Sequence, residues 1–252
     1  MGSFSVVVLG VGDAFSALHY STALALHAEG QWLLVECPHP LRKILRESGR
    51  AAGVDLDIGD LLGTIVTHLH ADHCAGLEGM AFYNRFVLAG PPPKLIAHAD
   101  NLTHLWQHHL CATMHQSMFP DDDEEPHREL SDWFDPIPLD ETRPIRVGPF
   151  SIECRRTEHL EPTTALKIRA AGRCLSISAD TRWDPSLIAW LEDADLVLHE
   201  ANTEAFIHTE YTRLCTLPEA LRAKMMVVHY PDELVIDDAV LPAAQQGMRY
   251  EV

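Results

Sequence analysis

The sequence predicts an α/β protein in which two halves, each built of strands and helices, stack as a sandwich with the helices outside. Two observations predict this fold class. Strand-like and helix-like segments alternate along the first half of the chain, and the same pattern returns after a short acidic break. The chain has 252 residues and is 46% hydrophobic, which is enough for one sizeable core or at most two modest domains.

The first half opens with the apolar run SVVVLG at 5–10, which predicts a buried strand running into the glycine turn GVGD. Similar short apolar runs predict four more strands, at 21–27, 32–36, 63–67 and 94–98. Apolar residues at helical spacing predict helices at 38–48, 74–88 and 101–118. Gly49 ends the first of these helices, and Gly90 followed by three prolines ends the second.

The composition changes at 121–126, where the run DDDEEP cannot bury itself and therefore predicts a loop. The second half is richer in strands, which we expect at 145–147, 150–156, 164–169, 174–178, 196–199 and 225–229. Helices are expected at 185–191 and 217–223. We interpret the chain as a single domain over residues 1–252, with a His-rich and acidic insertion near 99–135.

Charge and cysteine usage narrow the possible partners. The formal net charge is −18, and such a surface repels a phosphate backbone, so a long nucleic acid is disfavoured as a partner. No run approaches the roughly 18 apolar residues of a membrane span, and the N-terminus lacks the basic start of a signal peptide. Six scattered cysteines indicate reduced thiols, so we expect a cytoplasmic protein without membrane association.

The stretch TIVTHLHADHCAGL at 64–77 places His68, His70, Asp72 and His73 within six positions, directly after an apolar strand. Side chains at the point where a strand leaves a sheet are held by a rigid scaffold, which suits a binding site. Histidine and carboxylate are the usual ligands of catalytic zinc, which keeps one position open for water. Two metals about 3.5–4 Å apart can share a bridging hydroxide, but this cluster alone cannot supply ligands for both.

Three further candidate ligands lie where later strands end. His159 follows the strand 150–156, Asp180 follows 174–178, and His229 closes 225–229. A lone histidine among the 16 in this chain is more often an ordinary core or solvent-facing imidazole. Three suitable residues after three apolar strands, in addition to the first cluster, favour a metal site over that alternative.

The pattern His68-x-His70-x-Asp72-His73 resembles the signature of the metallo-β-lactamase fold. LGVGDAFSALHYSTALAL near the N-terminus, SADT at 178–181 and LVLHEAN at 196–202 are similar to segments of its ribonuclease Z-like phosphodiesterase branch. The resemblance covers nearly the whole chain. It implies a four-layer αββα sandwich and a metal-dependent hydrolase with two divalent ions, zinc first, with manganese or iron as alternatives.

Carried over residue by residue, the resemblance implies one metal held by His68, His70, His159 and Asp180, and another held by Asp72, His73, Asp180 and His229. Glu200 and His208 resemble a pair that orients a proton donor toward the leaving group, and Asp72 could also accept a proton from the attacking water. The expected reaction is attack of a metal-bridging hydroxide on a small phosphodiester, such as a cyclic nucleotide.

Three departures from that branch bear on the substrate. The usual Cys-Gly-Glu-Gly is here Cys37-Pro38-His39-Pro40, the His-Ser-Thr element lacks its serine at His208-Thr209, and the long basic arm that clamps tRNA has no counterpart. These changes disfavour tRNA 3′-processing endonuclease activity. Two divalent ions would outweigh Asp72, Asp180 and a bridging hydroxide by about one positive charge, which favours a small anionic substrate.

Several alternatives stay open. The same metal site could serve a lactone or ester hydrolase, and a catalytically silent ligand-binding or scaffold protein is a third possibility. His104 and His108 lie four residues apart in the His-rich segment 98–115, so they share a helix face. This segment could form a lid or substrate wall, an additional metal site, or a polar surface or dimer contact. The resemblance implies that such an insertion serves a dimer or the substrate mouth, so we expect a homodimer.

Overall fold

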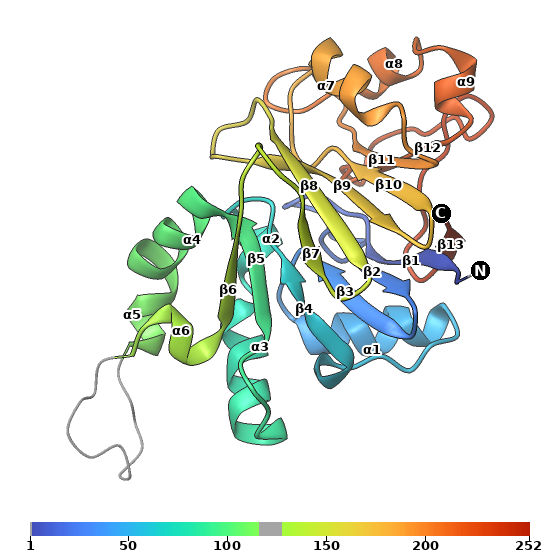
Figure 1. Ribbon diagram of the computed structural model, residues 1–252. Coiled ribbons are helices and arrows are strands. Elements are labelled where there is room, and N and C mark those ends of the chain that lie inside the picture. The colour runs from blue at the N-terminus through green and yellow to red at the C-terminus, as the bar shows by residue number, and fades with distance from the viewer. Residues whose placement is uncertain (1, 116–127) are drawn as a thin grey trace, which may run out of the picture.

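Two β-sheets stack face to face at the centre of the protein, and helices cover both outer faces, in the computed structural model, which describes residues 2–115 and 128–252 (Figure 1). This arrangement confirms the predicted sandwich with the helices outside. Side chains of both sheets meet in one apolar core, where the ring centroids of Phe4 and Phe150 lie 6.0 Å apart. The two chain ends lie side by side, because β1 and β13 pair.

The first sheet has the strand order β13-β1-β2-β3-β4-β5-β6. Its strands are β1 (Phe4–Gly10), β2 (Ala23–Ala28), β3 (Gln31–Val35), β4 (Leu61–Ile65), β5 (Lys94–His98), β6 (Asp135–Leu139) and β13 (Arg249–Glu251). The strands β3 to β6 pair in parallel, whereas β13, β1, β2 and β3 pair antiparallel. Parallel strands send their carboxyl ends to one edge of a sheet, so the loops after β4 and β5 leave at the same edge.

Helices of the first half pack on the outer face of this sheet. They are α1 (Leu41–Ala51), α2 (Ala71–Cys74), α3 (Leu77–Tyr83), α4 (Ala99–Leu105), α5 (Cys111–Met114) and α6 (Leu130–Trp133), with the 3₁₀ turn η1 (Ile58–Asp60) and the π-helical turns η2 (Asn84–Leu88) and η3 (Trp106–Leu110). The position of β1, covered on both faces, explains why its sequence is almost entirely apolar. Val6 and Val8 face the core between the sheets, whereas Val7 and Leu9 pack against the helices.

The second sheet has the strand order β12-β11-β10-β9-β8-β7. Its strands are β7 (Ile145–Val147), β8 (Phe150–Arg156), β9 (Thr164–Ala170), β10 (Arg173–Ile177), β11 (Leu196–Glu200) and β12 (Met225–Val228). The strands β10, β11 and β12 are parallel, so their carboxyl ends also share one edge. The outer face is covered by α7 (Pro185–Leu191), α8 (Tyr211–Leu214) and α9 (Glu219–Arg222).

Some predicted elements differ from the structure. The helix expected at 74–88 begins later, as α3 followed directly by η2, and the separate short helix α2 precedes it. The strand expected to reach residue 67 ends at Ile65. The strands β6 and β13 and the helices α6 and α8 were not predicted. In β6, Pro136 and Pro138 argue against a strand, but β6 is the last strand of its sheet, where missing N–H donors are tolerated.

The insertion near 99–135 is described only in part. Its described residues form α4, η3, α5, α6 and the start of β6. The acidic loop expected at 121–126 and the end of the helix expected at 101–118 lie outside the described residues. Within residues 2–115 and 128–252, none of the helices has both the length and the apolar character that a membrane crossing requires.

Candidate metal centre

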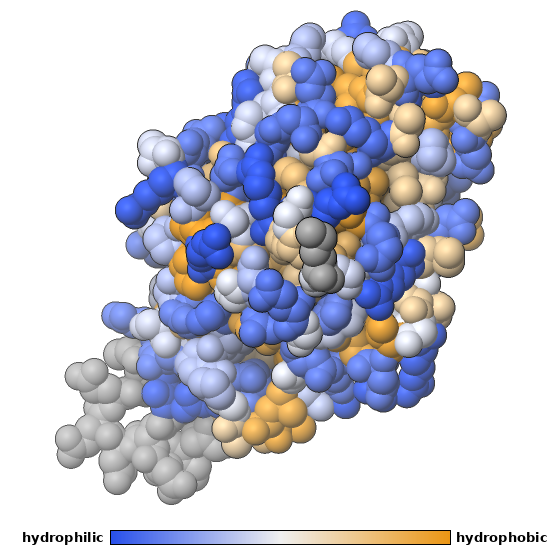
Figure 2. Space-filling view, turned by 45° about the vertical axis from the view of Figure 1, so that its right-hand side comes forward, coloured by the Kyte–Doolittle hydropathy of each residue, from blue (hydrophilic) through white to orange (hydrophobic). Residues whose placement is uncertain are grey.

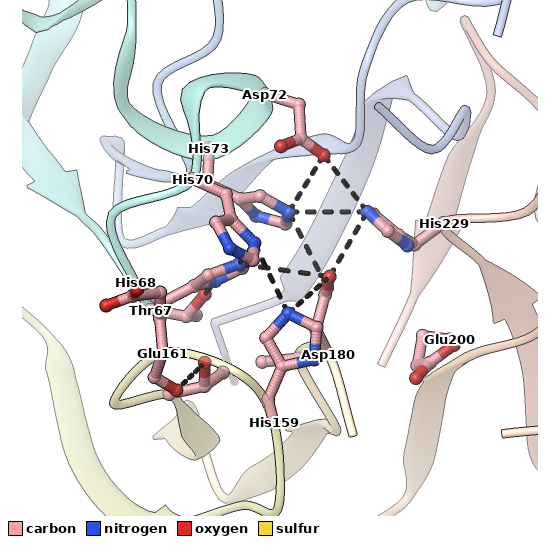
Figure 3. A network of polar contacts seen from close by, with 12 residues as sticks. Thr67, His68, His70, Asp72, His73, His159, Glu161, Asp180, Glu200 and His229 are labelled. Carbon is pink, nitrogen blue, oxygen red and sulfur yellow. Dashed lines mark hydrogen bonds and ion pairs between the residues drawn. The ribbon is translucent and has the colours of Figure 1, made fainter. Parts of the chain in front are cut away.

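Seven side chains converge where the loops at the carboxyl ends of four strands meet (Figure 3). His68 and His70 lie in the loop after β4, and Asp72 and His73 lie in α2, directly behind that loop. The other three follow strands of the second sheet: His159 after β8, Asp180 after β10 and His229 after β12. The structure therefore brings together all seven residues that the sequence nominated as metal ligands.

The first group consists of His68, His70, His159 and Asp180, whose ligand atoms all lie within 4.8 Å of one another. His70 Nδ1 lies 2.9 Å from His68 Nε2 and 3.3 Å from His159 Nε2. Nitrogens bound to one tetrahedral ion at about 2.0–2.1 Å would lie about 3.3–3.4 Å apart. These nitrogens are thus spaced like the donor atoms of one metal.

The second group consists of Asp72, His73 and His229. His73 Nε2 lies 3.3 Å from His229 Nε2, and the carboxylate oxygen Oδ2 of Asp72 lies 3.1 Å from the first nitrogen and 3.2 Å from the second. Three ligands of a tetrahedrally coordinated ion form one triangular face of the tetrahedron, and these three atoms form a nearly equilateral triangle of this kind.

Asp180 lies between the two groups and is almost completely buried. Its Oδ2 atom lies 3.7 Å from His159 Nε2 and 3.5 Å from His229 Nε2, one histidine from each group. Its Oδ1 atom is buried and has no hydrogen-bond partner among the described residues. A buried carboxylate oxygen without a donor is costly, so the residues present fit a cation at this position.

Burial and charge set the protonation of the cluster without metal. Burial opposes the charged form of His229, but the carboxylates of Asp180 and Asp72 outweigh it and raise the pKa to about 9. The pKa of His73 is also raised, by Asp180 and Glu36 against the effect of burial. Burial lowers the pKa of His68 well below its usual value. Without metal, the carboxylates therefore favour protonated His73 and His229, so that protons occupy nitrogens that metal ions would otherwise bind.

Glu36 is a site residue that the sequence analysis did not nominate. It is buried at the end of β3, and its carboxylate accepts hydrogen bonds from Thr67 N at 3.2 Å and Thr67 Oγ1 at 2.5 Å. The same carboxylate lies 3.3 Å from His73 Nδ1. When a carboxylate accepts a hydrogen bond from the ring nitrogen that does not bind the metal, it fixes the tautomer and the orientation of the histidine. The available signal was an acidic residue directly after the apolar strand WLLV.

Backbone strain accompanies this cluster. Glu36, Ala179 and His229 have φ values of 65°, 51° and 51°, in the left-handed region that residues other than glycine rarely adopt. Each lies at or next to the point where a strand delivers a side chain to the cluster. Strained residues of this kind persist where the surrounding structure holds them in place, and they are enriched at functional sites.

Glu200 and His208 lie beside the cluster and belong to neither of the two predicted sets of four metal ligands. His208 Nδ1 lies 3.2 Å from Glu200 Oε1 and 4.0 Å from Asp180 Oδ2. His208 also forms a group of ligand atoms with Asp180 and His229, so geometry alone permits it to bind metal. Glu200 is the last residue of β11, is buried, and is not among the residues that line the cavity at the cluster.

The surroundings of Glu200 favour its role as a support for His208. Its Oε1 atom accepts hydrogen bonds from the backbone nitrogens of Thr181 at 2.8 Å and Thr209 at 3.2 Å. Burial raises the pKa of Glu200, whereas its hydrogen bond to His208 acts in the opposite direction. Burial lowers and the contact with Glu200 raises the pKa of His208, and the net shift is upward. His208 can therefore hold a proton near neutral pH.

A cavity of about 570 Å³ opens onto the cluster. Its lining combines metal-ligand candidates of the cluster with the apolar residues Ala14, Phe15, Leu160 and Ile207. A second cavity of about 300 Å³ adjoins His70 and is lined by His104, His108 and His109 of the insertion. In the part of the chain that the structure describes, none of these three histidines belongs to a group of three or more potential metal ligands.

A sequence model of one protein family matches residues 4–247, and its description is anti-Pycsar protein Apyc1. The anti-Pycsar protein Apyc1 of Bacillus phage 010DV004 is 30% identical over 244 residues, which cover 92% of this chain and 91% of that protein. Apyc1 of Paenibacillus xerothermodurans is 27% identical over 239 residues, covering 92% of this chain and 90% of its own.

Solved structures share the whole fold at low sequence identity. The metallo-β-lactamase fold protein YhfI of Bacillus subtilis superposes with a TM-score of 0.75 at 20% identity, covering 99% of this chain and 100% of its own. Human tRNase Z, short form, gives 0.69 at 19% identity with 98% of both chains covered. Unliganded yeast PDE1 gives 0.74 at 11% identity with full coverage of both. These matches confirm the metallo-β-lactamase fold that the motifs indicated.

Proposed function

The chain belongs to the family of the anti-Pycsar protein Apyc1, and on that premise we propose that it hydrolyses the phosphodiester of a cyclic mononucleotide. It is a metal-dependent hydrolase of the metallo-β-lactamase fold. Cyclic pyrimidine nucleotides are the first substrates to test, given the family. The observation that carries the proposal is Asp180, which contacts both groups of metal-ligand candidates and lines a cavity of mononucleotide size.

The metal complement we propose is two divalent ions, with zinc as the first candidate because imidazole and carboxylate ligands suit it. His68, His70, His159 and Asp180 would hold one, and Asp72, His73, Asp180 and His229 the other. When bound, such ions stabilise charge on phosphoryl oxygens and lower the pKa of water. Asp180 connects the two groups. It belongs to the first group, and each of its oxygens lies 3.5 Å from a histidine of the second group.

The residues of this chain divide the proton transfers between them. Asp72 faces the cavity and can accept a proton from the attacking water. His208 lines the same cavity and can donate a proton to the departing ribose oxygen. Glu200 does not reach the cavity, so we assign it a positioning role, in which its hydrogen bond sets the orientation and basicity of His208.

Substrate size follows from the cavity and from the charge. The cavity accommodates a mononucleotide, while the net charge of −18 opposes a long polyanion. Figure 2 shows one face of the molecule, which is largely hydrophilic with separate hydrophobic patches. We therefore propose that tRNA precursors are poor substrates at physiological salt.

We also propose a cytoplasmic homodimer. In the described residues none of the six cysteines forms a disulfide, which fits a reducing compartment. Val87 and Leu88 are exposed next to each other at the end of η2 and offer apolar surface for a second copy. Light scattering coupled to size exclusion measures the oligomeric state directly.

One experiment tests the function. Purified protein is analysed for metal content and assayed with cyclic CMP, cyclic UMP, cyclic AMP, bis(p-nitrophenyl) phosphate, a tRNA precursor and a lactone panel. We expect about two divalent ions per chain and hydrolysis of cyclic nucleotides well above that of the other natural substrates. Preferential lactone hydrolysis, or 3′-trimming of the tRNA precursor, would assign the site to a different reaction. Absence of hydrolysis from a metal-loaded protein would indicate a binding or scaffold role.

A further inference from the structure

Phe15 lines the cavity of the metal centre although its side chain is 91% exposed. A single exposed aromatic residue is common on protein surfaces and by itself needs no explanation. This one differs in two ways. It lines the same cavity as the metal-ligand candidates, and hydrogen bonds to two carboxylates fix the turn that carries it.

The turn around Phe15 is held by two carboxylates. Asp13 Oδ1 accepts a hydrogen bond from the backbone N of Phe15 at 2.9 Å. The two oxygens of Asp232 accept from Ser16 Oγ at 2.5 Å and from the backbone N of Ala17 at 2.7 Å. Phe15 is thus flanked on both sides by anchored residues. An exposed aromatic ring on a fixed turn loses little entropy when a ligand binds against it.

The same hydrogen bonds fix this turn relative to the metal centre. Asp232 lies three residues after His229, a metal-ligand candidate, in the loop that follows β12. The backbone N of Asp13 donates to Tyr230 O at 3.2 Å, and the backbone N of Tyr230 donates to Val11 O at 3.1 Å. The turn of Phe15 and the loop of His229 therefore form one hydrogen-bonded unit.

We propose that the ring of Phe15 is the platform on which the nucleobase stacks while the phosphodiester lies at the metal centre. The inference rests on the proposed function, because it requires a substrate with a phosphoryl group at one end and a flat apolar group at the other. Leu160 and Ile207 line the same cavity and would offer the base further apolar contacts. Stacking on an aromatic ring recognises the π-face that every base has, so this platform predicts tolerance among nucleobases.

Variants of one turn separate this role from a general surface role. Leu18 is 73% exposed on the same turn but does not line the cavity, so Leu18→Ala is the matched control. The probes are a cyclic nucleotide and the cyclic ribose phosphate that lacks the base. Phe15→Ala should raise KM for the nucleotide about tenfold with little change in kcat and leave KM for the base-free compound unchanged. Phe15→Trp should restore nucleotide binding, because it keeps an aromatic face.

Calorimetry on the metal-loaded protein gives a readout independent of turnover. The dissociation constants of a nucleoside monophosphate and of ribose phosphate are measured for each variant, and Phe15→Ala should weaken only the first. Equal effects on both ligands, an equal effect of Leu18→Ala, or a change of oligomeric state in Phe15→Ala would overturn the inference. If wild type hydrolyses no phosphodiester yet Phe15 governs nucleotide binding, the proposed function fails and the platform stands.

Discussion

Two groups of histidines lie next to each other in this protein, and only one is built to hold metal. The inner group, at the ends of β4, β8, β10 and β12, is largely buried and includes Asp72 and Asp180 among its members. The outer group, His104, His108 and His109, lies on helical turns of the insertion around a cavity that adjoins His70. The ring centroids of His104 and His108 lie 5.7 Å apart, and no carboxylate completes a set of three with them in the described residues.

The comparison shows that histidine density is a weak indicator of a metal site. The outer group has as many histidines in a short segment as the opening motif HLHADH. The inner group differs because four separate strands deliver its ligands, and because carboxylates supply the negative charge that a divalent cation needs. Convergence of side chains from distant segments is the property that distinguishes the two.

The largest effect should come from removing one inner histidine and comparing it with an outer one. His159→Ala deletes a proposed ligand of the first group, so we expect loss of at least one metal and nearly all phosphodiesterase activity. His108→Ala should keep the metal content and most of the activity. Mass spectrometry for bound metal and an assay on one cyclic nucleotide decide this. Metal loss in His108→Ala would show that the outer group contributes ligands after all.

A second prediction concerns His208, which lies at the boundary of the inner group. His208→Ala should retain both metals but lose about 10²–10⁴-fold in kcat on a substrate with an alkoxide leaving group, because general acid assistance is worth about that much. The loss on a p-nitrophenyl ester should be far smaller, since that leaving group needs little protonation. Equal losses on both substrates would remove the proton-donor role, and lost metal would instead make His208 a ligand.

The fold and the inner group were predictable from sequence because both follow from local patterns. Apolar strands such as CLSIS and MMVV end just before Asp180 and His229, and the HxHxDH spacing is distinctive. Glu36 was missed because its role depends on Thr67 and His73, which only the tertiary structure brings to it. The strand β6 was missed because two prolines obscure it. Phe15 was not singled out because only the tertiary structure places it in the same cavity as the metal-ligand candidates.

A third prediction concerns Glu36 and tests whether metal binding by the inner group depends on a carboxylate that lies outside that group. Glu36→Gln keeps the size of the side chain but removes the charge beside His73 Nδ1. We expect metal affinity to fall about 10–100-fold, as is typical when the partner of a metal-binding histidine is lost. Competition with a chelator measures the affinity. Glu78→Gln, in α3 outside the cluster, is the matched control and should leave the affinity unchanged.

The smallest effect concerns the stability of the metal-free protein between pH 6.5 and pH 9. Asp180 and Asp72 raise the pKa of His229 to about 9 against the effect of burial, whereas its usual value is 6.5. A raised pKa means that the folded state holds a proton that the unfolded state has lost. This contribution is fully present below pH 6.5 and disappears as the pH rises through about 9. The melting temperature of the metal-free protein should therefore fall across this interval.

The metal-bound protein gives the contrast, because its ligands must already be deprotonated and the ions replace the protons. Its melting temperature should be higher at every pH and should not fall between pH 6.5 and pH 9. Asp180→Asn removes the carboxylate that most strongly favours charged His229. The melting temperature of the metal-free variant should therefore depend much less on pH. His104→Ala, in the outer group, should retain the wild-type slope. If the melting temperature of metal-free Asp180→Asn still fell with pH as in the wild type, groups outside the inner group would control this titration.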